Sequence, residues 1–276
     1  MPVWKTRRRT LDLTRKGAIM GVLNATPDSF SDGGDFMNPD HACRHALDMA
    51  ATGADIIDIG GESSRPGAVP VSEEEELARV IPVIMRIRCA SDVLISIDTC
   101  KARVAAAAVE AGADIINDIT ALSGDPGMMR VADETGAGIV LMHMRGTPQT
   151  MQLDPQYDDV VAEVRDFLRQ RFEAAVACGI DPMRMALDPG IGFGKTPAHN
   201  RKLLRECAAF DVAGRPVLIG VSRKSFLNPE KPEERFWPGV AFTSMCRELG
   251  ARIFRVHDPR PHRDALRMTE AILQGV

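Results

Sequence analysis

The chain has 276 residues, of which 45% are hydrophobic and 26% are charged, a composition typical of a globular enzyme. A net charge of −4 and a pI of about 5.9 argue against a nucleic-acid-binding protein with a broad basic face. No stretch approaches the roughly eighteen apolar residues of a membrane span, and no apolar segment of a signal peptide follows the basic residues 7–9.

Eight short runs rich in Ile and Val recur along the chain. In order, they cover residues 18–23, 55–59, 93–97, 114–118, 138–142, 184–187, 216–221 and 252–256. Strands that are this continuously apolar are buried on both faces, as in parallel sheets. Their alternation with helical patterns predicts a single-domain (β/α)8 TIM barrel over residues 18–276, preceded by an N-terminal extension, residues 1–17, that covers the bottom of the barrel. A doubly wound open sheet is the alternative, although no GxGxxG motif follows the first strand.

Local signals place two of the intervening helices. Ser72 and Glu75 form a capping-box pattern, which predicts a helix start at this point. Its buried face is expected to contain Leu77, Val80, Ile81, Ile84 and Ile87. A second helix is expected from about Asp154 to Gly179, with a buried stripe of Val161, Val164, Leu168 and Phe172. Glycines at positions 53, 112, 136 and 250 each precede a strand and indicate the ends of helices.

Polar residues follow almost every predicted strand at its carboxyl end. They are Asn24, Glu62, Asp98, Asn117, His143, Asp188, Lys224 and His257, with Ser63, Ser64 and Arg65 in the loop after the second strand. Any one of them is as easily explained as the N-cap of the next helix. Because the chemistry of a (β/α)8 barrel takes place at the carboxyl ends of its strands, their convergence predicts a polar pocket at the barrel mouth.

The polar groups of this pocket fall into two sets. The acceptor-rich set is Asp98, Asn117 and Asp188, and the anion-binding set is Ser64, Arg65, Arg255 and His257. A carboxylate suits a flat heterocycle whose edge offers two parallel N–H donors. Arginine prefers phosphate-like oxygens, and residues 255 and 257 face the same side of one strand. The expected ligand therefore has a heterocycle at one end and a phosphate at the other.

The segment DPGIGFGKT (188–196) ends like a phosphate-binding loop. A Walker A motif, however, needs a glycine five residues before Gly194, and that position holds Pro189. We therefore expect no bound nucleotide here. The alternating glycines instead let the backbone turn close to a flat ligand. Lys195 is open between a catalytic lysine and a solvated or helix-entry lysine, and we favour the second interpretation.

Eight motifs occur together and in order. They are MGVLNATPDSFSDGG (20–34), GADIIDIGGESSRPGA (53–68), ISIDT (95–99), IINDI (115–119), LMHMRGTPQTMQ (141–152), DPGIGFGKT (188–196), GVSRKSF (220–226) and RVHD (255–258). The set resembles the dihydropteroate synthase family over about residues 18–260. This resemblance implies the condensation of 6-hydroxymethyl-7,8-dihydropterin pyrophosphate with p-aminobenzoate, which gives 7,8-dihydropteroate and pyrophosphate in folate biosynthesis. It also implies a target of sulfonamides.

The resemblance assigns roles to individual residues. The pterin-binding set is Asp98, Asn117, Asp188 and Lys224, and the pyrophosphate-binding set is Asn24, Ser64, Arg65, Arg255 and His257. The p-aminobenzoate pocket is formed by Pro66, Phe193, Ser222 and Lys224. A loop with Asp28, Phe30 and Asp32 closes over the site, and Asn24 and Asp32 hold Mg²⁺. The residues expected to be catalytic are Lys224, Asp98, Arg255 and His257.

The implied reaction passes through an SN1-like pterin cation. The bond to pyrophosphate breaks, and Mg²⁺ and cationic side chains stabilise the departing anion. The aniline nitrogen is already a neutral nucleophile, so no activating Ser–His or Cys–His pair is required. The resemblance further implies a homodimer. The six scattered cysteines form no CxxC pair, which is consistent with reduced thiols in a cytoplasmic protein without a structural metal site, and neither nucleic acid nor membrane is expected as a partner.

Two alternatives remain open. A methyltetrahydrofolate–corrinoid methyltransferase would share the pterin carboxylates but would have no use for Arg65, Arg255 and His257. A non-catalytic paralogue would bind the pterin without turnover. The chain departs from the usual family pattern at Ser64, where threonine is common, and at residues 227–229 and 235–246. His143 is interpreted as a support residue of the pocket, and the remaining histidines on helices and loops as surface or capping residues, namely His41, His45, His199 and His262.

Overall fold

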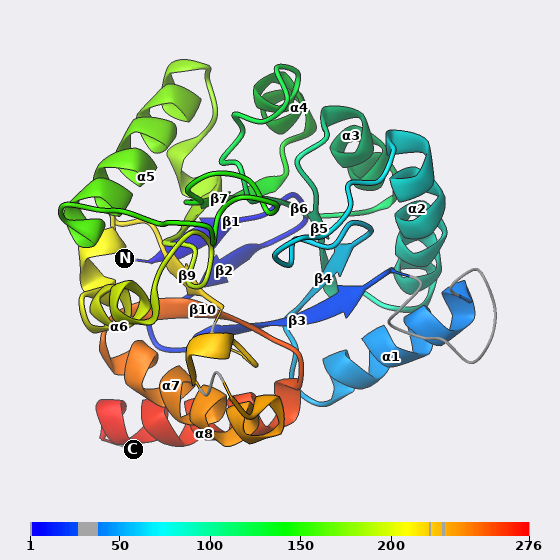
Figure 1. Ribbon diagram of the computed structural model, residues 1–276. Coiled ribbons are helices and arrows are strands. Elements are labelled where there is room, and N and C mark those ends of the chain that lie inside the picture. Colours follow the sequence, from blue (N-terminus) through cyan, green and yellow to red (C-terminus); the bar gives the residue numbers. More distant parts are fainter. Residues whose placement is uncertain (1, 27–37, 221, 228–229, 276) are drawn as a thin grey trace.

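The computed structural model describes residues 2–26, 38–220, 222–227 and 230–275. Within these residues, eight parallel strands pair in the order β10–β3–β4–β5–β6–β7–β8–β9 and close into a barrel (Figure 1). Their bounds are β3 Ala18–Asn24, β4 Ile56–Gly60, β5 Leu94–Asp98, β6 Ile115–Asp118, β7 Gly138–Met142, β8 Met185–Asp188, β9 Val217–Ile219 and β10 Ala251–Val256. The closed barrel confirms the predicted fold class and excludes the open sheet.

Helices follow the strands and surround the barrel (Figure 1). The α-helices in the described part of the chain are α1 Pro39–Ala51, α2 Glu73–Ala90, α3 Ala102–Ala111, α4 Met128–Thr135, α5 Val160–Ala177, α6 Pro197–Arg205, α7 Phe236–Glu248 and α8 Pro259–Gln274. Short 3-10 helices are η2 Pro182–Arg184, η3 Cys207–Phe210, η4 Ser225–Leu227 and η5 Pro232–Arg235. Among the described residues, apolar side chains between the strands and these helices form the larger of two hydrophobic clusters.

The start of α2 agrees with the prediction only in part. Ser72 is the N-cap, and its hydroxyl accepts a hydrogen bond from the backbone N–H of Glu75 at 3.1 Å. The Glu75 carboxylate pairs with Arg79 instead of returning to the cap. On the predicted apolar face, Leu77 and Ile81 are only partly buried.

The predicted start of α5 near Asp154 is wrong. The helix begins at Val160, because the carboxylate of Asp159 caps it by accepting from the backbone N–H groups of Val161 and Ala162. Aspartate followed by proline is a frequent helix start, but here residues 154–157 have no regular secondary structure. Which of the two nearby aspartates caps the helix depends on the path of the preceding loop.

The glycine repeat has a common structural cause. All four predicted glycines have positive φ, for example +121° at Gly112. A Cβ at Gly112 would lie 2.9 Å from Cγ of Arg88, which crosses over it to pair with Asp114 at 2.6 Å. Asp114 also accepts from the backbone N–H of Ile95 on the neighbouring strand, at 2.9 Å. The glycine thus ends a helix and leaves room for an arginine that ties the next helix–strand turn to its neighbour.

The N-terminal segment closes the bottom of the barrel. Strands β1 (Val3–Lys5) and β2 (Thr10–Asp12) form an antiparallel hairpin. A second hydrophobic cluster joins this segment to the barrel strands and contains Trp4, Leu13, Ala18, Met20, Ile56, Leu94, Ile115, Val140, Ala186, Leu218 and Ile253. Trp4 is fully buried, and its indole N–H donates to the carbonyl of Arg184 at 2.8 Å. The hairpin therefore seals the end opposite to the strand tips.

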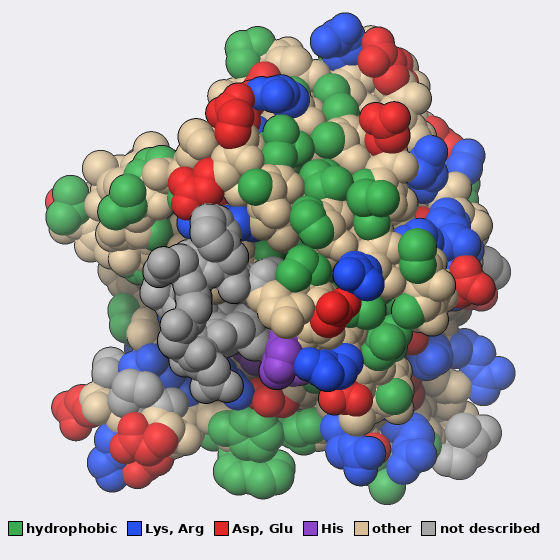
Figure 2. Space-filling model, turned by 90° about the vertical axis from the view of Figure 1, so that its right-hand side faces the viewer, with side chains coloured by type: hydrophobic (Ala, Val, Ile, Leu, Met, Phe, Trp, Pro, Cys, Tyr) green, Lys and Arg blue, Asp and Glu red, His purple; other side chains and the backbone are tan. Residues whose placement is uncertain are grey.

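The outer surface agrees with the composition. On the face shown in Figure 2, basic and acidic side chains are intermixed and no continuous basic surface is visible there. None of the helices in the described ranges is both long and apolar enough to cross a membrane.

Candidate active site

The strand register brings three of the predicted polar residues to one level of the barrel mouth. Asn24 on β3 pairs with Gly60 on β4, and Gly60 pairs with Asp98 on β5. Asp98 in turn pairs with Asn117 on β6. Asp188 is the last residue of β8 and is 7% exposed. The predicted acceptor groups therefore meet at the carboxyl ends of the strands, where a (β/α)8 barrel carries its chemistry.

Arg255 lies at the centre of these groups and binds two carboxylates. Its Nε donates to Oδ2 of Asp58 at 2.6 Å, and its Nη2 donates to Oδ2 of Asp98 at 2.6 Å. The side-chain amide of Asn117 donates to the same Asp58 oxygen at 3.2 Å. Burial alone would lower the pKa of Arg255, but Asp58 and Asp98 raise it above its ordinary value. Arg255 is thus a permanent cation whose orientation is set by two acids.

Asp58 is a residue of the site that sequence reasoning missed. It lies within β4, in a stretch counted as an apolar run, and it is fully buried. The signal was its position between Ile57 and Ile59, because a strand alternates its side chains between the helix layer and the barrel interior. A charged residue in that pattern points into the barrel and needs a buried partner.

The buried carboxyls are tuned toward neutral pH. Burial raises the pKa of Asp98 to about 7, against the opposing effect of Arg255. Burial also raises the pKa of Asp188 to about 6, although the backbone N–H of Gly190 donates to it at 2.7 Å and lowers the value. A ligand that offers N–H donors to these oxygens would favour their ionised forms.

Lys224 and Phe193 are in contact with each other. The Lys224 ammonium lies 4.3 Å from the centre of the Phe193 ring. Burial and then Arg255 lower the pKa of Lys224 to about 8, while Asp188 and Asp98 oppose this effect. Two members of the predicted p-aminobenzoate pocket are therefore in contact, and Lys224 is electrostatically coupled to the predicted pterin acids.

Ser222 and His257 form a second pair. The Ser222 hydroxyl lies 3.1 Å from Nδ1 of His257 and accepts from the His257 backbone N–H at 3.3 Å. Burial, followed by Arg255, lowers the pKa of His257 to about 4. His257 is therefore neutral near pH 7 and can serve an anion as a hydrogen-bond donor but not as a cation.

The loop after β4 contacts the segment that follows β7, where the backbone N–H of Gly67 donates to the carbonyl of Pro148 at 3.1 Å. Arg65 and Pro66 are exposed on it, and Ser64 is half-buried. Its base is held by Arg79, which donates to the carbonyl of Gly61 at 2.7 Å. Within the described ranges, no hydrogen bond or ion pair joins this loop to Arg255, His257, Phe193 or Lys224. The predicted pyrophosphate and p-aminobenzoate sets are thus assembled only in part.

Lys195 lies at a helix entry as predicted, directly before Thr196, the N-cap of α6, but the prediction that it is solvated is wrong. Lys195 is 2% exposed, and its Nζ lies 2.9 Å from the carbonyl of Phe193 and 2.9 Å from Nδ1 of His143. The glycine-rich segment folds back tightly against the end of β7. Gly190 has a φ of +68°, and a Cβ there would lie 1.8 Å from the carbonyl oxygen of His143. This close approach carries the lysine into the interior.

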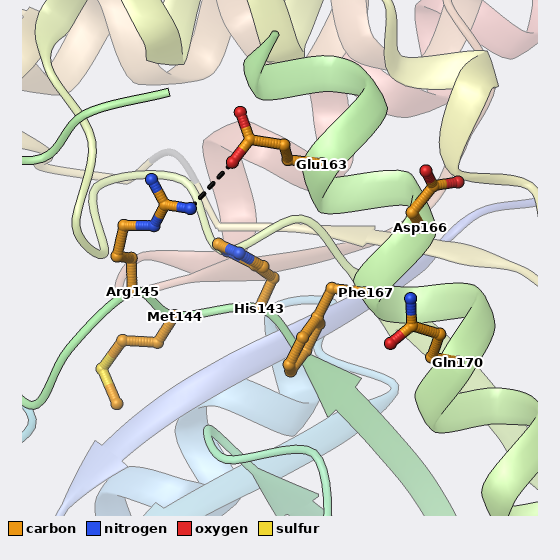
Figure 3. A pocket seen from close by; sticks show the side chains of 7 residues that line it. All are labelled: His143, Met144, Arg145, Glu163, Asp166, Phe167 and Gln170. Atoms are coloured by element: carbon orange, nitrogen blue, oxygen red, sulfur yellow. Dashed lines mark hydrogen bonds and ion pairs between the residues drawn. The ribbon is translucent and has the colours of Figure 1, made fainter. Parts of the chain in front are cut away.

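His143 contacts Lys195 of the glycine-rich segment and also lines a surface hollow of about 480 Å³ (Figure 3). The hollow is lined by His143, Met144, Arg145, Glu163, Asp166, Phe167 and Gln170. The His143 ring packs edge-on against Phe167, with ring centres 4.9 Å apart. Burial and then Lys195 lower the pKa of His143 to about 3, so the ring is neutral. None of the predicted substrate-binding residues lines the hollow, and we assign it no ligand.

The other histidines were predicted correctly except one. His41 and His45 are exposed, and His199 takes part in the capping box with Thr196 at the start of α6. His262 is 1% exposed and bonds to the Thr243 hydroxyl at 2.7 Å between α8 and α7. It was predicted at the surface because a histidine on an amphipathic helix gives no local sign of which helix packs over it.

Of the two predicted Mg²⁺ ligands, Asn24 lies within the described residues and Asp32 does not. Asp28, Phe30 and Asp32 of the closing loop lie outside the described residues. In the described ranges, no group of three or more His, Cys, Asp or Glu side chains could hold a metal ion. Asn24 supplies an amide oxygen at the mouth, and Mg²⁺ in phosphate-transfer sites commonly takes one or two protein oxygens together with substrate phosphates and water. The residues present fit such a site.

Comparison with known proteins agrees with the site. The chain matches the family model of pterin binding enzymes over residues 20–257. Dihydropteroate synthase from Escherichia coli (strain K12) is 46% identical over 269 residues, which cover 96% of this chain and 95% of that protein. The structure of Xanthomonas albilineans dihydropteroate synthase with 4-aminobenzoic acid matches with a TM-score of 0.92 and 45% identity, and covers 100% of this chain and 99% of that chain. The Burkholderia cenocepacia enzyme complexed with 7,8-dihydropteroate matches with a TM-score of 0.89 and 42% identity, and covers 99% and 97%. The chain therefore belongs to the pterin binding enzyme family and, within it, to the dihydropteroate synthases.

Proposed function

We propose that this protein joins 6-hydroxymethyl-7,8-dihydropterin pyrophosphate to p-aminobenzoate, giving 7,8-dihydropteroate and pyrophosphate. The observation that carries the proposal is the cluster of Asp98, Asn117 and Asp188 around a fixed arginine at the barrel mouth. Relatives more than 40% identical over nearly the whole chain were solved with 4-aminobenzoic acid and with 7,8-dihydropteroate. Substrate and product of the proposed reaction are therefore accommodated by this fold.

The acceptor groups suit the pterin end of the substrate. Carboxylate and amide oxygens of Asp98, Asn117 and Asp188 would accept the N–H groups along the edge of the ring. A carboxylate near the ring also stabilises the positive charge that spreads over it when the C–O bond to pyrophosphate breaks. The aniline nitrogen then forms the new C–N bond and loses a proton. The acids thus serve both recognition and the cationic transition state.

The departing pyrophosphate would meet Arg255. A guanidinium has five N–H donors, and Asp58 and Asp98 occupy one each. In the described part of the chain, three donors therefore remain for phosphate oxygens. Neutral His257 would add a hydrogen bond, and Ser64 and Arg65 would join when the loop that carries them closes over the ligand. The bond-breaking step is assisted by donors whose direction is already set.

Mg²⁺ is proposed at the same end, with Asn24 and Asp32 as protein ligands. When bound, it would neutralise charge on the leaving pyrophosphate. A homodimer and a cytoplasmic location are proposed on the family resemblance, and sedimentation velocity would test the first of these. Sulfonamide inhibition is expected by the same reasoning, and Ser64 retains the hydroxyl group of the usual threonine.

The proposal is tested by measuring pyrophosphate release with both substrates and again without p-aminobenzoate. We expect release that depends on p-aminobenzoate, together with formation of 7,8-dihydropteroate. Methyl transfer from methyltetrahydrofolate would instead identify a corrinoid-linked methyltransferase. Tight binding of the dihydropterin without product would identify a non-catalytic paralogue.

A further inference from the structure

Lys195 is a buried lysine that the proposed reaction does not use. Its Nζ lies 2.9 Å from the carbonyl oxygen of Phe193, 2.9 Å from Nδ1 of His143 and 3.4 Å from the carbonyl oxygen of His143. Within the described residues, no carboxylate pairs with it inside 4.0 Å. An ammonium group has three N–H donors, and three acceptors surround this one. Because a buried charge is costly unless it is hydrogen-bonded, these acceptors are what hold Lys195 in the interior.

The three contacts join two different strand ends. His143 follows β7, whereas Phe193 lies in the glycine-rich segment after β8. Two flanking carbonyls of that segment are held from outside, since Gln152 donates to Gly192 at 2.7 Å and Tyr157 donates to Gly194 at 2.9 Å. Lys195 binds the carbonyl between them from the buried side. The backbone at residues 192–194 is therefore held at each residue. The N–H of Gly192 also donates to the buried side chain of Asn200 at 2.8 Å, and the N–H of Phe193 donates to the carbonyl of Gly190 at 3.1 Å. Among the described residues, Lys195 is the side chain that binds the Phe193 carbonyl.

This clamp acts on Phe193 and not on the pterin acid. The Phe193 ring lies against the Lys224 ammonium at 4.3 Å, so the position of its backbone sets one wall of the predicted p-aminobenzoate pocket. Asp188 is held by hydrogen bonds that Lys195 does not make. The backbone N–H of His143 donates to the Asp188 carbonyl at 3.0 Å, and the backbone N–H of Gly190 donates to its carboxylate at 2.7 Å. The two ends of the substrate site thus depend on different local contacts.

We propose that Lys195 is a positioning residue that sets the p-aminobenzoate side of the site, through Phe193, and leaves the pterin side unchanged. This inference rests on the proposed function. It gives the lysine of DPGIGFGKT a structural purpose that does not involve phosphate.

The test is steady-state kinetics of Lys195→Met, which keeps the chain length and removes all three donors. The matched control is Lys202→Met on α6, because Lys202 is exposed and pairs only with Asp159 among the described residues. Loss of hydrogen bonds from a charged donor corresponds to a rise of about tenfold in KM for p-aminobenzoate. KM for the dihydropterin pyrophosphate and kcat should stay within about twofold, because Lys195 touches neither the pterin acids nor the reacting atoms.

A second pair of variants decides the question if Lys195→Met does not fold. His143→Phe keeps the ring that packs on Phe167 but removes the acceptor, whereas His143→Asn keeps an acceptor close to the position of Nδ1. We expect the selective rise in KM for p-aminobenzoate in the first variant and near-wild-type values in the second. Equal rises for both substrates, or unchanged values in Lys195→Met and His143→Phe, would overturn the inference. Wild-type turnover tests the proposed function separately, so the two failures can be told apart.

Discussion

Replacing Asp58 by alanine would remove the buried oxygen that accepts from both Arg255 and Asn117. Asp58→Asn is the matched change, because its amide oxygen can still accept while the negative charge is lost. Both variants leave Asp98 as the second partner of Arg255. The comparison therefore tests whether Asp98 alone is enough to orient the guanidinium of Arg255.

The magnitude follows from the contacts. Removing one member of a buried ion pair costs about 3–5 kcal/mol of folding free energy. Two features reduce this loss. Oδ1 of Asp58 has no hydrogen-bond partner among the described residues, so part of its own burial cost is recovered, and Arg255 keeps Asp98 at 2.6 Å. We expect Asp58→Ala to lower the free energy of unfolding by about 2 kcal/mol and Asp58→Asn by about 1 kcal/mol.

The two substitutions should also lower kcat/KM. A guanidinium held at one end only can rotate away from the leaving pyrophosphate, and oriented donors of this kind contribute about 100-fold or more to rate. We expect kcat/KM to fall about 100-fold in Asp58→Ala and about tenfold in Asp58→Asn. Urea unfolding gives the stability, and pyrophosphate release gives the rate. Asp48→Ala on the exposed face of α1 is the control, with a change in stability within about 0.5 kcal/mol.

Two results would refute this reasoning. Folded Asp58→Ala protein with wild-type kcat/KM would show that the aim of Arg255 does not depend on Asp58. If Asp58→Asn lost as much stability and kcat/KM as Asp58→Ala, the hydrogen bond to residue 58 would contribute nothing without its negative charge.

Three further predictions concern other parts of the molecule. Trp4 is fully buried at the end of the barrel opposite to the strand tips. Trp4→Ala should therefore lower the free energy of unfolding by about 4 kcal/mol in urea titration and leave kcat of the folded protein unchanged. A loss of activity without a loss of stability would contradict this. Burial lowers the pKa of His262 from 6.5 to about 4 in the folded protein. The unfolded chain therefore takes up the proton first as pH falls from 6.5 towards 4, and stability should decrease by up to about 1.4 kcal/mol per pH unit from this group; His262→Phe should show a shallower pH dependence of unfolding, and an unchanged slope would exclude this contribution. Lys224→Ala should lose about 100-fold in kcat/KM, because the ammonium lies over the Phe193 ring and interacts electrostatically with Asp188 and Asp98. Unchanged turnover and pterin affinity would remove Lys224 from the site.

Much of the architecture could be read from local patterns. Most barrel strands are short runs rich in buried Ile, Val and Leu, which need burial on both faces, and their alternation with helical patterns predicts the parallel barrel. The glycines that end helices have positive φ for local steric reasons. Because the carboxyl ends of parallel strands meet at one rim, strand order was not needed to predict that Asp98, Asn117 and Asp188 would lie at the same mouth.

What the sequence could not decide is which polar groups are buried and what they bind. Asp58 sits in an apolar run, and only the closure of the barrel places Arg255 beside it. Lys195 follows three glycines that suggest an exposed turn, and only the packing of that turn on the end of β7 brings the ammonium to His143. Arg65 lies in a recognisable motif, yet it is exposed, and among the described residues no hydrogen bond joins its loop to Arg255 or His257. Secondary structure follows from contacts within a few residues, whereas the partner of a buried charge lies far away along the chain, 197 residues apart for Arg255 and Asp58, and is chosen by the tertiary fold alone.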